Sequence, residues 1–338
     1  MEQFKGKVWV LGDDIDTKVV AIGGGTGLST MLKGLKLHTH NITAVVTVAD
    51  DGGSSGILRS DLGMLAPGDV RNCVSALAEV DPVMGELLNF RFKDGSLKGH
   101  SLGNLFLAAL NETSSSFDEA VKKFSHLAGV VGTVYPVTNE SVTLSALLED
   151  GRLIEGESHI GVHHDGPKNG IVKLMVNPEK PKAVDGVIKA LEKADIIVLG
   201  PGSLYTSIIP NLLVDGVVDA IKKSNAVKIY VCNIMSQAGE TENYTVSDHL
   251  AAIERHSYEG IADIVIANNA IIPESLRIKY ASEHAREVMI DSINVLKRAK
   301  LVQGNLLLVR NDKIRHNFSR LARTIMRLGS DVNYFENK

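Results

Sequence analysis

The stretch KVVAIGGGTGLSTMLKGLK occupies residues 18–36 of the 338-residue chain. A short run of apolar, β-branched residues reaches a cluster of glycines and then passes into a segment with apolar residues every three to four positions. The first part is typical of a buried strand, and residues 29–37 are typical of an amphipathic helix. The stretch therefore predicts a strand that turns sharply into a helix, with much backbone exposed at the turn.

Other segments repeat this alternation of strand and helix. Nearly continuous apolar runs, as expected for parallel strands covered on both faces, lie at residues 42–49, 194–200, 228–233 and 262–268. Between the first and second of these runs, most of the sequence has helical spacing. Strands separated by helices predict an α/β fold with a Rossmann-like, doubly wound, mostly parallel sheet.

The pattern changes in the middle of the chain. Residues 149–151, Glu-Asp-Gly, separate two alternating segments and indicate a hairpin, so we expect a β-rich inserted subdomain at about 133–176. We expect a single domain over 18–330, with an N-terminal arm at 1–17 and a tail at 331–338. The last part of this domain has the pattern of a hairpin followed by a helix.

Composition excludes several classes of partner. A formal net charge of −4 offers no basic surface for nucleic acid. Cys73 and Cys232 are too far apart for a zinc motif, and reduced thiols are expected. No apolar run approaches the roughly 20 residues that span a bilayer, and no export signal is recognisable, so we expect a cytoplasmic protein. Symmetric dimers are common among such proteins, so we expect a homodimer.

The first turn is the strongest candidate for a binding site. Its residues are Gly23, Gly24, Gly25, Thr26 and Gly27. Glycine lets a ligand approach the backbone, and free N–H groups at a helix start attract phosphate. We predict that the turn binds a diphosphate, and a tight turn without a ligand is the alternative. The dinucleotide pattern G-x-G-x-x-G fails because Leu28 is large, and the P-loop pattern fails because Lys33 comes too late.

The second strand is followed by an acidic turn, VADDGGSSGILRSDLG, at residues 48–63. The adjacent carboxylates Asp50 and Asp51, beside Gly52, suit a ribose hydroxyl or Mg²⁺, with Asp61 as a third metal ligand. The alternative is that Asp51 caps a turn and Asp61 is solvated. Mg²⁺ is therefore expected as a cofactor only if these carboxylates bind a metal.

Two further segments add polar side chains near these turns. In APGDVRNCVSAL, residues 66–77, Asp69 can cap a helix, and Arg71 and Asn72 suit contact with phosphate. A salt bridge between Arg71 and an aspartate is the alternative. In GHSLGNL, residues 99–105, Asn104 lies near a helix start, and the histidine could donate to an anion.

A second glycine turn follows the third buried strand, in VLGPGSLYTSIIPNLL at residues 198–213. Gly200, Gly202 and Ser203 open the next helix, and Asn233 follows the strand after that. Ligands of open α/β sheets bind at the carboxyl ends of strands, so the two glycine turns predict one crevice. Four residues resemble a cluster of metal ligands: His159, His163, His164 and Asp165. A solvated loop is the simpler interpretation of this group.

Together these motifs resemble the YvcK/CofD-like family, on the gluconeogenesis-factor side. They are GGGTGLS, TVADDGGSSG, PGDVRN, GHSLGNL, GPGSLYTSIIPNLL and QAGET with SDHL, and the match covers residues 18–327. The resemblance implies a Rossmann-like domain and a UDP-sugar ligand such as UDP-N-acetylglucosamine. It also implies support of cell shape and of cell-wall synthesis during gluconeogenic growth. By the same matching, Tyr280 and Arg315 are implied UDP-sugar contacts.

Three functions are compatible with these residues. The first is a UDP-sugar-binding regulatory protein that acts on cell-wall synthesis proteins, with little or no turnover. The second is a transferase similar to 2-phospho-L-lactate transferase, in which Mg²⁺ on Asp50 and Asp51 neutralises a leaving group and Arg71 stabilises charge. The third is a dinucleotide-dependent oxidoreductase, which the broken glycine pattern argues against. The family motifs favour the first.

Overall fold

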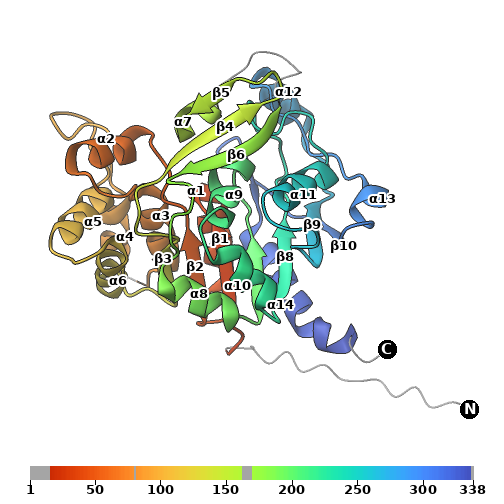
Figure 1. Ribbon diagram of the computed structural model, residues 1–338, viewed down its shortest axis with the longest axis horizontal. Coiled ribbons are helices and arrows are strands. Elements are labelled where there is room, and N and C mark those ends of the chain that lie inside the picture. Colours follow the sequence, from red (N-terminus) through yellow and green to blue (C-terminus); the bar gives the residue numbers. More distant parts are fainter. Residues whose placement is uncertain (1–15, 80, 162–169, 336–338) are drawn as a thin grey trace, which may run out of the picture.

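The computed structural model describes residues 16–79, 81–161 and 170–335, and the expected N-terminal arm lies almost wholly outside them (Figure 1). Its main sheet is parallel, with strand order β10-β9-β8-β7-β1-β2-β3. The strands are β1 (Val19–Gly23), β2 (Ile42–Val46), β3 (Thr133–Pro136), β7 (Ile196–Leu199), β8 (Val227–Val231), β9 (Ile264–Asn268) and β10 (Lys300–Gly304). The predicted α/β fold with a doubly wound sheet is confirmed.

The strand order of the sheet reverses between the neighbouring strands β1 and β7. Strands β1 to β3 are added toward one edge, and β7 to β10 toward the other. Because crossovers between parallel strands are right-handed, this reversal places helices on both faces of the sheet. One packed group is α1 (Gly25–Leu35), α3 (Gly68–Leu77) and α14 (Phe318–Phe335), and another is α8 (Asp185–Glu192), α9 (Ile209–Leu212) and α10 (Val217–Lys223).

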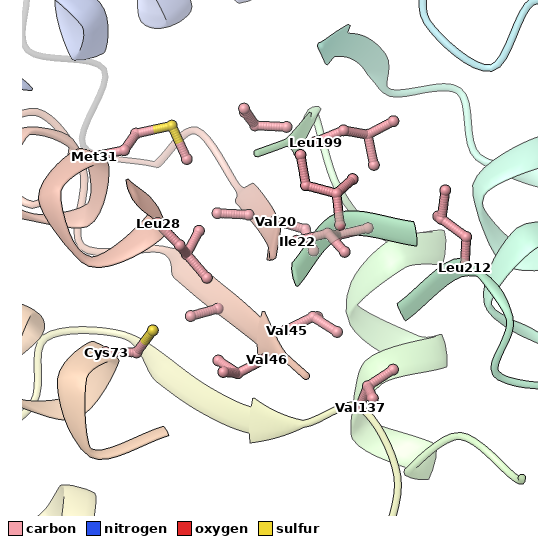
Figure 2. Close-up of a cluster of buried hydrophobic side chains, with 14 of the residues drawn as sticks. Val20, Ile22, Leu28, Met31, Val45, Val46, Cys73, Val137, Leu199 and Leu212 are labelled. Carbon is pink, nitrogen blue, oxygen red and sulfur yellow. The ribbon is translucent and has the colours of Figure 1, made fainter. Parts of the chain in front are cut away.

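The core lies between these helices and the central strands. Every residue of β1 is buried, which explains its unbroken apolar sequence. Figure 2 shows Leu28 and Met31 of α1 close to this strand, together with Cys73 of α3. Full burial of one such aliphatic side chain contributes about 1.5–3 kcal/mol. Leu28 is therefore a core residue, and it occupies the position where a dinucleotide-binding turn has a small residue.

The predicted helical interval between β2 and β3 is confirmed. It contains α2 (Gly53–Leu62), α3, α4 (Pro82–Asn89), α5 (Leu102–Glu112) and α6 (Phe117–Leu127). Ser101 and Ser116 each accept a hydrogen bond from the backbone N–H three residues later, so both cap the helices that follow them.

The inserted subdomain begins later than the sequence suggested. A separate antiparallel sheet consists of β4 (Thr143–Leu148), β5 (Leu153–Glu155) and β6 (Ile171–Asn177). The short helix α7 (Glu157–Ile160) lies between β5 and β6 in the chain. β3, which was included in the expected insertion, pairs with β2 at the edge of the main sheet. An edge strand alternates between buried and less buried residues, so its sequence resembles an antiparallel strand.

The C-terminal part contains the expected hairpin, β11 (Leu307–Arg310) and β12 (Lys313–His316), before α14. α14 extends to Phe335, so the expected tail is largely helical. The remaining elements are the π-helix η1 (Leu204–Ile208), α11 (Val246–Arg255), α12 (Glu274–Ser282) and α13 (Ser292–Val295). Within the described residues, no helix has the length and apolar character required to cross a membrane.

Candidate functional site

A cavity of about 720 Å³, which we call the sheet-edge cavity, lies where β1, β2, β7 and β8 end. Both glycine turns line it, and β1 and β7 are the neighbouring strands at which the sheet order reverses. Ligands of open α/β sheets bind at this kind of position. The volume lies within the range of small-molecule sites, about 300–1,000 Å³.

The first glycine turn combines close packing with exposed backbone. A Cβ atom at Gly24 would lie 2.5 Å from Oδ2 of Asp69, and one at Gly27 would lie 2.4 Å from the carbonyl oxygen of Pro201. Gly25 has a φ of +62°, a conformation that side chains disfavour. Packing alone thus requires Gly24 and Gly27, whereas a Cβ atom at Gly25 would lie 3.9 Å from the side chains of Asp69 and Ser207, an ordinary contact distance.

Asp69 belongs to this turn although it lies on another helix. α3 begins at Gly68, so Asp69 is in its first turn and does not cap it as the sequence suggested. Its carboxyl group accepts hydrogen bonds from the Gly25 N–H and the Asn72 side chain. Burial, followed by the nearby Asp50, raises the pKa of Asp69 to about 6. A carboxyl group therefore faces the start of α1, where the phosphate was expected.

The second glycine turn is held by its own side chains. Oγ of Ser203 accepts the Thr206 N–H at 3.0 Å, which caps η1, and it donates to Glu240. Nδ2 of Asn233 donates to the Gly202 carbonyl at 2.7 Å. Ser203 and Asn233 thus fix the shape of the turn, in addition to lining the cavity.

The inserted subdomain contributes an acid to the cavity. Asp51 accepts the N–H groups of Glu157 and Ser158 at 2.9 and 2.8 Å, so it holds the first turn of α7. Glu157 then lines the cavity, and burial, followed by the charge of Asp50, raises its pKa to about 7. The wall of the cavity consequently contains Asp50, Asp69, Glu157 and Glu240, and adding an anionic ligand there favours their protonation.

The predicted metal triad is not assembled. The carboxylate of Asp51 accepts hydrogen bonds from backbone N–H groups of α7, and Asp61 lies exposed near the end of α2. In the described parts of the chain, no group of three His, Cys, Asp or Glu residues is arranged to hold a metal ion. The two aspartates were grouped by their nearness in sequence, but ten residues of helix separate the start of α2 from its end. His163, His164 and Asp165 lie outside the described residues, and His159 is exposed.

Arg71 lies outside the lining of the sheet-edge cavity. It is buried, and its guanidinium donates to the amide oxygens of Asn104 at 3.3 Å and Asn89 at 2.8 Å. Asn104 in turn donates to Ser54, which also contacts His100. This buried polar network joins α2, α3, α4 and α5. Arg71 thus forms hydrogen bonds to amides, and not the salt bridge with an aspartate that was the alternative to phosphate contact.

Tyr280 and Arg315 line the same cavity, although they come from α12 and β12. The Tyr280 hydroxyl accepts the Ile314 N–H at 2.9 Å, which ties α12 to the strand that carries Arg315. The adjacent His316 is buried, and this burial lowers its pKa to about 4, so the imidazole is neutral at physiological pH.

The structure divides the predicted residues into two sets. Those that line the sheet-edge cavity are Gly24, Gly25, Thr26, Gly27, Asp50, Gly202, Ser203, Asn233, Tyr280 and Arg315. Those outside its lining are Gly23, Asp51, Gly52, Asp61, Arg71, Asn72, Asn104 and Gly200. Lining residues that sequence reasoning missed include Glu157 and Glu240, and Asp69 was considered only as a cap. The QAGET motif could have indicated Glu240, but nothing in the sequence distinguishes Glu157 from other surface acids.

Comparisons with known proteins agree with this architecture. A family model described as 2-phospho-L-lactate transferase CofD matches residues 19–307. A protein named gluconeogenesis factor from Halalkalibacterium halodurans is 45% identical over 313 residues, which cover 91% of this chain and 95% of that protein. Another of that name from Bacillus subtilis is 43% identical, covering 92% and 98%. The crystal structure of a UPF0052 family member from Bacillus halodurans matches with a TM-score of 0.88 at 43% identity, covering 92% of this chain and 99% of that one.

Proposed function

The chain belongs to the CofD family, and from this premise we propose that it is a gluconeogenesis factor that binds a UDP-sugar, represented by UDP-N-acetylglucosamine. One observation supports the proposal above others: both glycine turns, Tyr280 and Arg315 line the same cavity at the reversal point of the sheet. Peptide N–H groups at the start of α1 suit a diphosphate, and an arginine can bind phosphate through two hydrogen bonds.

The acids of the cavity give the proposed ligand its second point of recognition. Sugar hydroxyl groups are hydrogen-bond donors, and the carboxyl groups of Glu157 and Glu240 are acceptors on the same wall. A diphosphate beside Asp69 would repel its carboxylate, so binding should favour the protonated form of that group. UDP-sugar binding is therefore expected to take up protons between about pH 6 and 7.

Isothermal titration calorimetry tests the proposal directly. We expect UDP-N-acetylglucosamine to bind with a dissociation constant of about 1–100 µM, and UMP and GTP to bind at least about tenfold more weakly. Removal of the guanidinium in Arg315→Ala should weaken binding by about 10- to 100-fold. Arg310→Ala is the matched control, because Arg310 is exposed on the neighbouring strand β11 and lies outside the cavity lining. Equal heats for the three nucleotides, or none, would refute the proposal.

Gly25→Val separates the effect of backbone strain from that of a blocked site. A valine at a φ of +62° is strained, and its Cβ atom would lie 3.9 Å from the side chains of Asp69 and Ser207, which line the cavity. Gly63→Val carries the same strain, because Gly63 has a φ of +64° and lies at the end of α2, outside the cavity lining. We expect both variants to lose similar stability and only Gly25→Val to lose UDP-sugar binding.

A transferase activity is the second candidate, favoured by the description of the matching family model. Because the residues predicted to hold Mg²⁺ are not brought together, we derive no step through a metal. Phosphorus NMR of the protein with Mg²⁺ and UDP-N-acetylglucosamine over several hours distinguishes the two functions. A binding protein leaves the diphosphate resonances unchanged, whereas steady appearance of UMP or UDP would establish turnover.

The proposal extends to a cellular role by resemblance to the gluconeogenesis factors. A strain without this protein should grow and keep its shape on a glycolytic carbon source, and should lose normal cell shape on a gluconeogenic one. Complementation with the Gly63→Val variant should restore shape, and complementation with Gly25→Val should not. Restoration by both variants would mean that the cellular role does not need the proposed site.

A further inference from the structure

A second surface, which adjoins the sheet-edge cavity at Tyr280, has the features of an interface. We define the α12 surface as α12 and the segment 286–296, which includes α13, together with Ile271 just before α12. In Figure 1, α12 lies at the top of the molecule and α13 lies at its right edge. Neither segment contributes to the seven-stranded sheet.

Several large apolar side chains in these segments are exposed. Ile271 is 91% exposed, Ile293 78% and Met289 72%, which are the three highest values among the exposed large apolar residues of the described chain. Ile278 and Leu296 are each 63% exposed. Single exposed apolar residues are ordinary on a monomer, but several within one short segment mark a surface that contacts another molecule.

Most residues of α12 are exposed in the described chain. Leu276 is the only buried residue of this nine-residue helix, and Tyr280 is partly buried. Helices this short are marginal in water without a packed apolar face. A cavity of about 750 Å³ lies beside the helix and is lined in part by Ile278, Met289 and Ile290, so an exposed apolar side chain of α12 borders a hollow.

Charge distribution identifies the kind of partner. Residues 271–298 contain five basic and four acidic side chains, so their formal charge is +1. This near balance suits neither a nucleic acid nor an anionic membrane, each of which selects a strongly basic surface. Arg286 and Glu287 both line the hollow, and neither forms an ion pair with another described residue.

A surface with adjacent unpaired charges of both signs around an apolar centre is complementary to itself. In a two-fold dimer the same patch meets its own copy, so Arg286 of each chain can face Glu287 of the other. We infer that the α12 surface is the docking site for a second copy of this chain, with an isologous interface centred on Ile278 and Met289.

Sedimentation velocity tests this inference on the full chain. Between about 0.5 and 50 µM we expect the wild type to sediment increasingly as a dimer. Ile278→Glu and Met289→Glu, which place a charge at the centre of both halves of the interface, should each raise the dimer dissociation constant at least about tenfold. Leu37→Glu is the matched control, because Leu37, just after α1, is 62% exposed, against 63% for Ile278, and lies outside the α12 surface. The control should sediment like the wild type.

Hydrogen exchange locates the interface without any substitution. On concentrating the wild type, amides of α12 and of residues 286–296 should become protected, and those of α4 should not. A wild type that remains monomeric over the whole range would overturn the inference. So would a dimer whose association is unchanged in both glutamate variants, or one whose protected amides lie elsewhere, because either result would place the interface on another surface.

Discussion

Replacing Asp69 by asparagine tests the electrostatics of the cavity through protein stability. The pKa of Asp69 is raised from 3.8 to about 6, by about two units, and each unit corresponds to 1.36 kcal/mol. Ionised Asp69 therefore costs the folded state at most about 3 kcal/mol. Asp69 lines the cavity and is only partly buried, so solvent screening reduces this cost to about 2 kcal/mol.

The sign of the pH dependence follows from proton binding. Between about pH 4 and 6 the folded protein holds the proton of Asp69 more tightly than the unfolded chain, so stability falls as pH rises through this range. The cost is complete above about pH 7 and absent well below pH 4. Asparagine does not titrate, so its advantage over aspartate should be about 1 kcal/mol greater at pH 8 than at pH 5.

Urea denaturation followed by circular dichroism at the two pH values measures this difference. The comparison between pH values cancels any pH-independent loss, such as a weaker hydrogen bond to Asn72. Asp219→Asn is the control, because Asp219 is an exposed acid in the first turn of α10 and should show no such difference. An effect of Asp69→Asn that is the same at both pH values would refute the assigned repulsion and burial cost.

Three further predictions concern the glycine turns, the buried network and the proton linkage. Gly27→Ala would bring a methyl group 2.4 Å from a carbonyl oxygen of the second turn, so calorimetric affinity for UDP-N-acetylglucosamine should fall at least about tenfold, whereas Gly85→Ala, in open space, should leave it unchanged. Arg71→Ala removes the guanidinium donor from two amide oxygens and should lower the free energy of unfolding by about 2–4 kcal/mol, with affinity retained; lost affinity at normal stability would place Arg71 in the site. UDP-sugar affinity should rise from pH 8 to pH 6, because Glu157, with a raised pKa of about 7, can take up a proton on binding. Calorimetric titrations in buffers of different ionisation enthalpy measure this proton uptake, which should be smaller in Glu157→Gln.

The family resemblance read from the motifs is confirmed by the matching family model and relatives. The positions of the parallel strands followed from β-branched runs, because strands buried on both faces need apolar side chains throughout. The edge strand β3 was assigned to the inserted subdomain, although it belongs to the main sheet. One face of β3 is less buried than the other, so its sequence has the alternation of an antiparallel strand. Metal binding by Asp50, Asp51 and Asp61 was inferred from their nearness in sequence. Asp50 and Asp51 precede the start of α2, whereas Asp61 lies near its end, so the length of this helix separates Asp61 from the other two.

The sequence alone determined the α/β fold, both glycine turns and their placement at strand ends, because each depends on local preferences of a few neighbouring residues. Only the tertiary structure decided what faces those turns. Asp69 from α3, Glu157 from α7 and Arg315 from β12 line one cavity, which lies where the sheet order reverses between β1 and β7. The raised pKa values of Asp69 and Glu157 arise from distances between chain segments far apart in sequence, and no local pattern of residues encodes those distances.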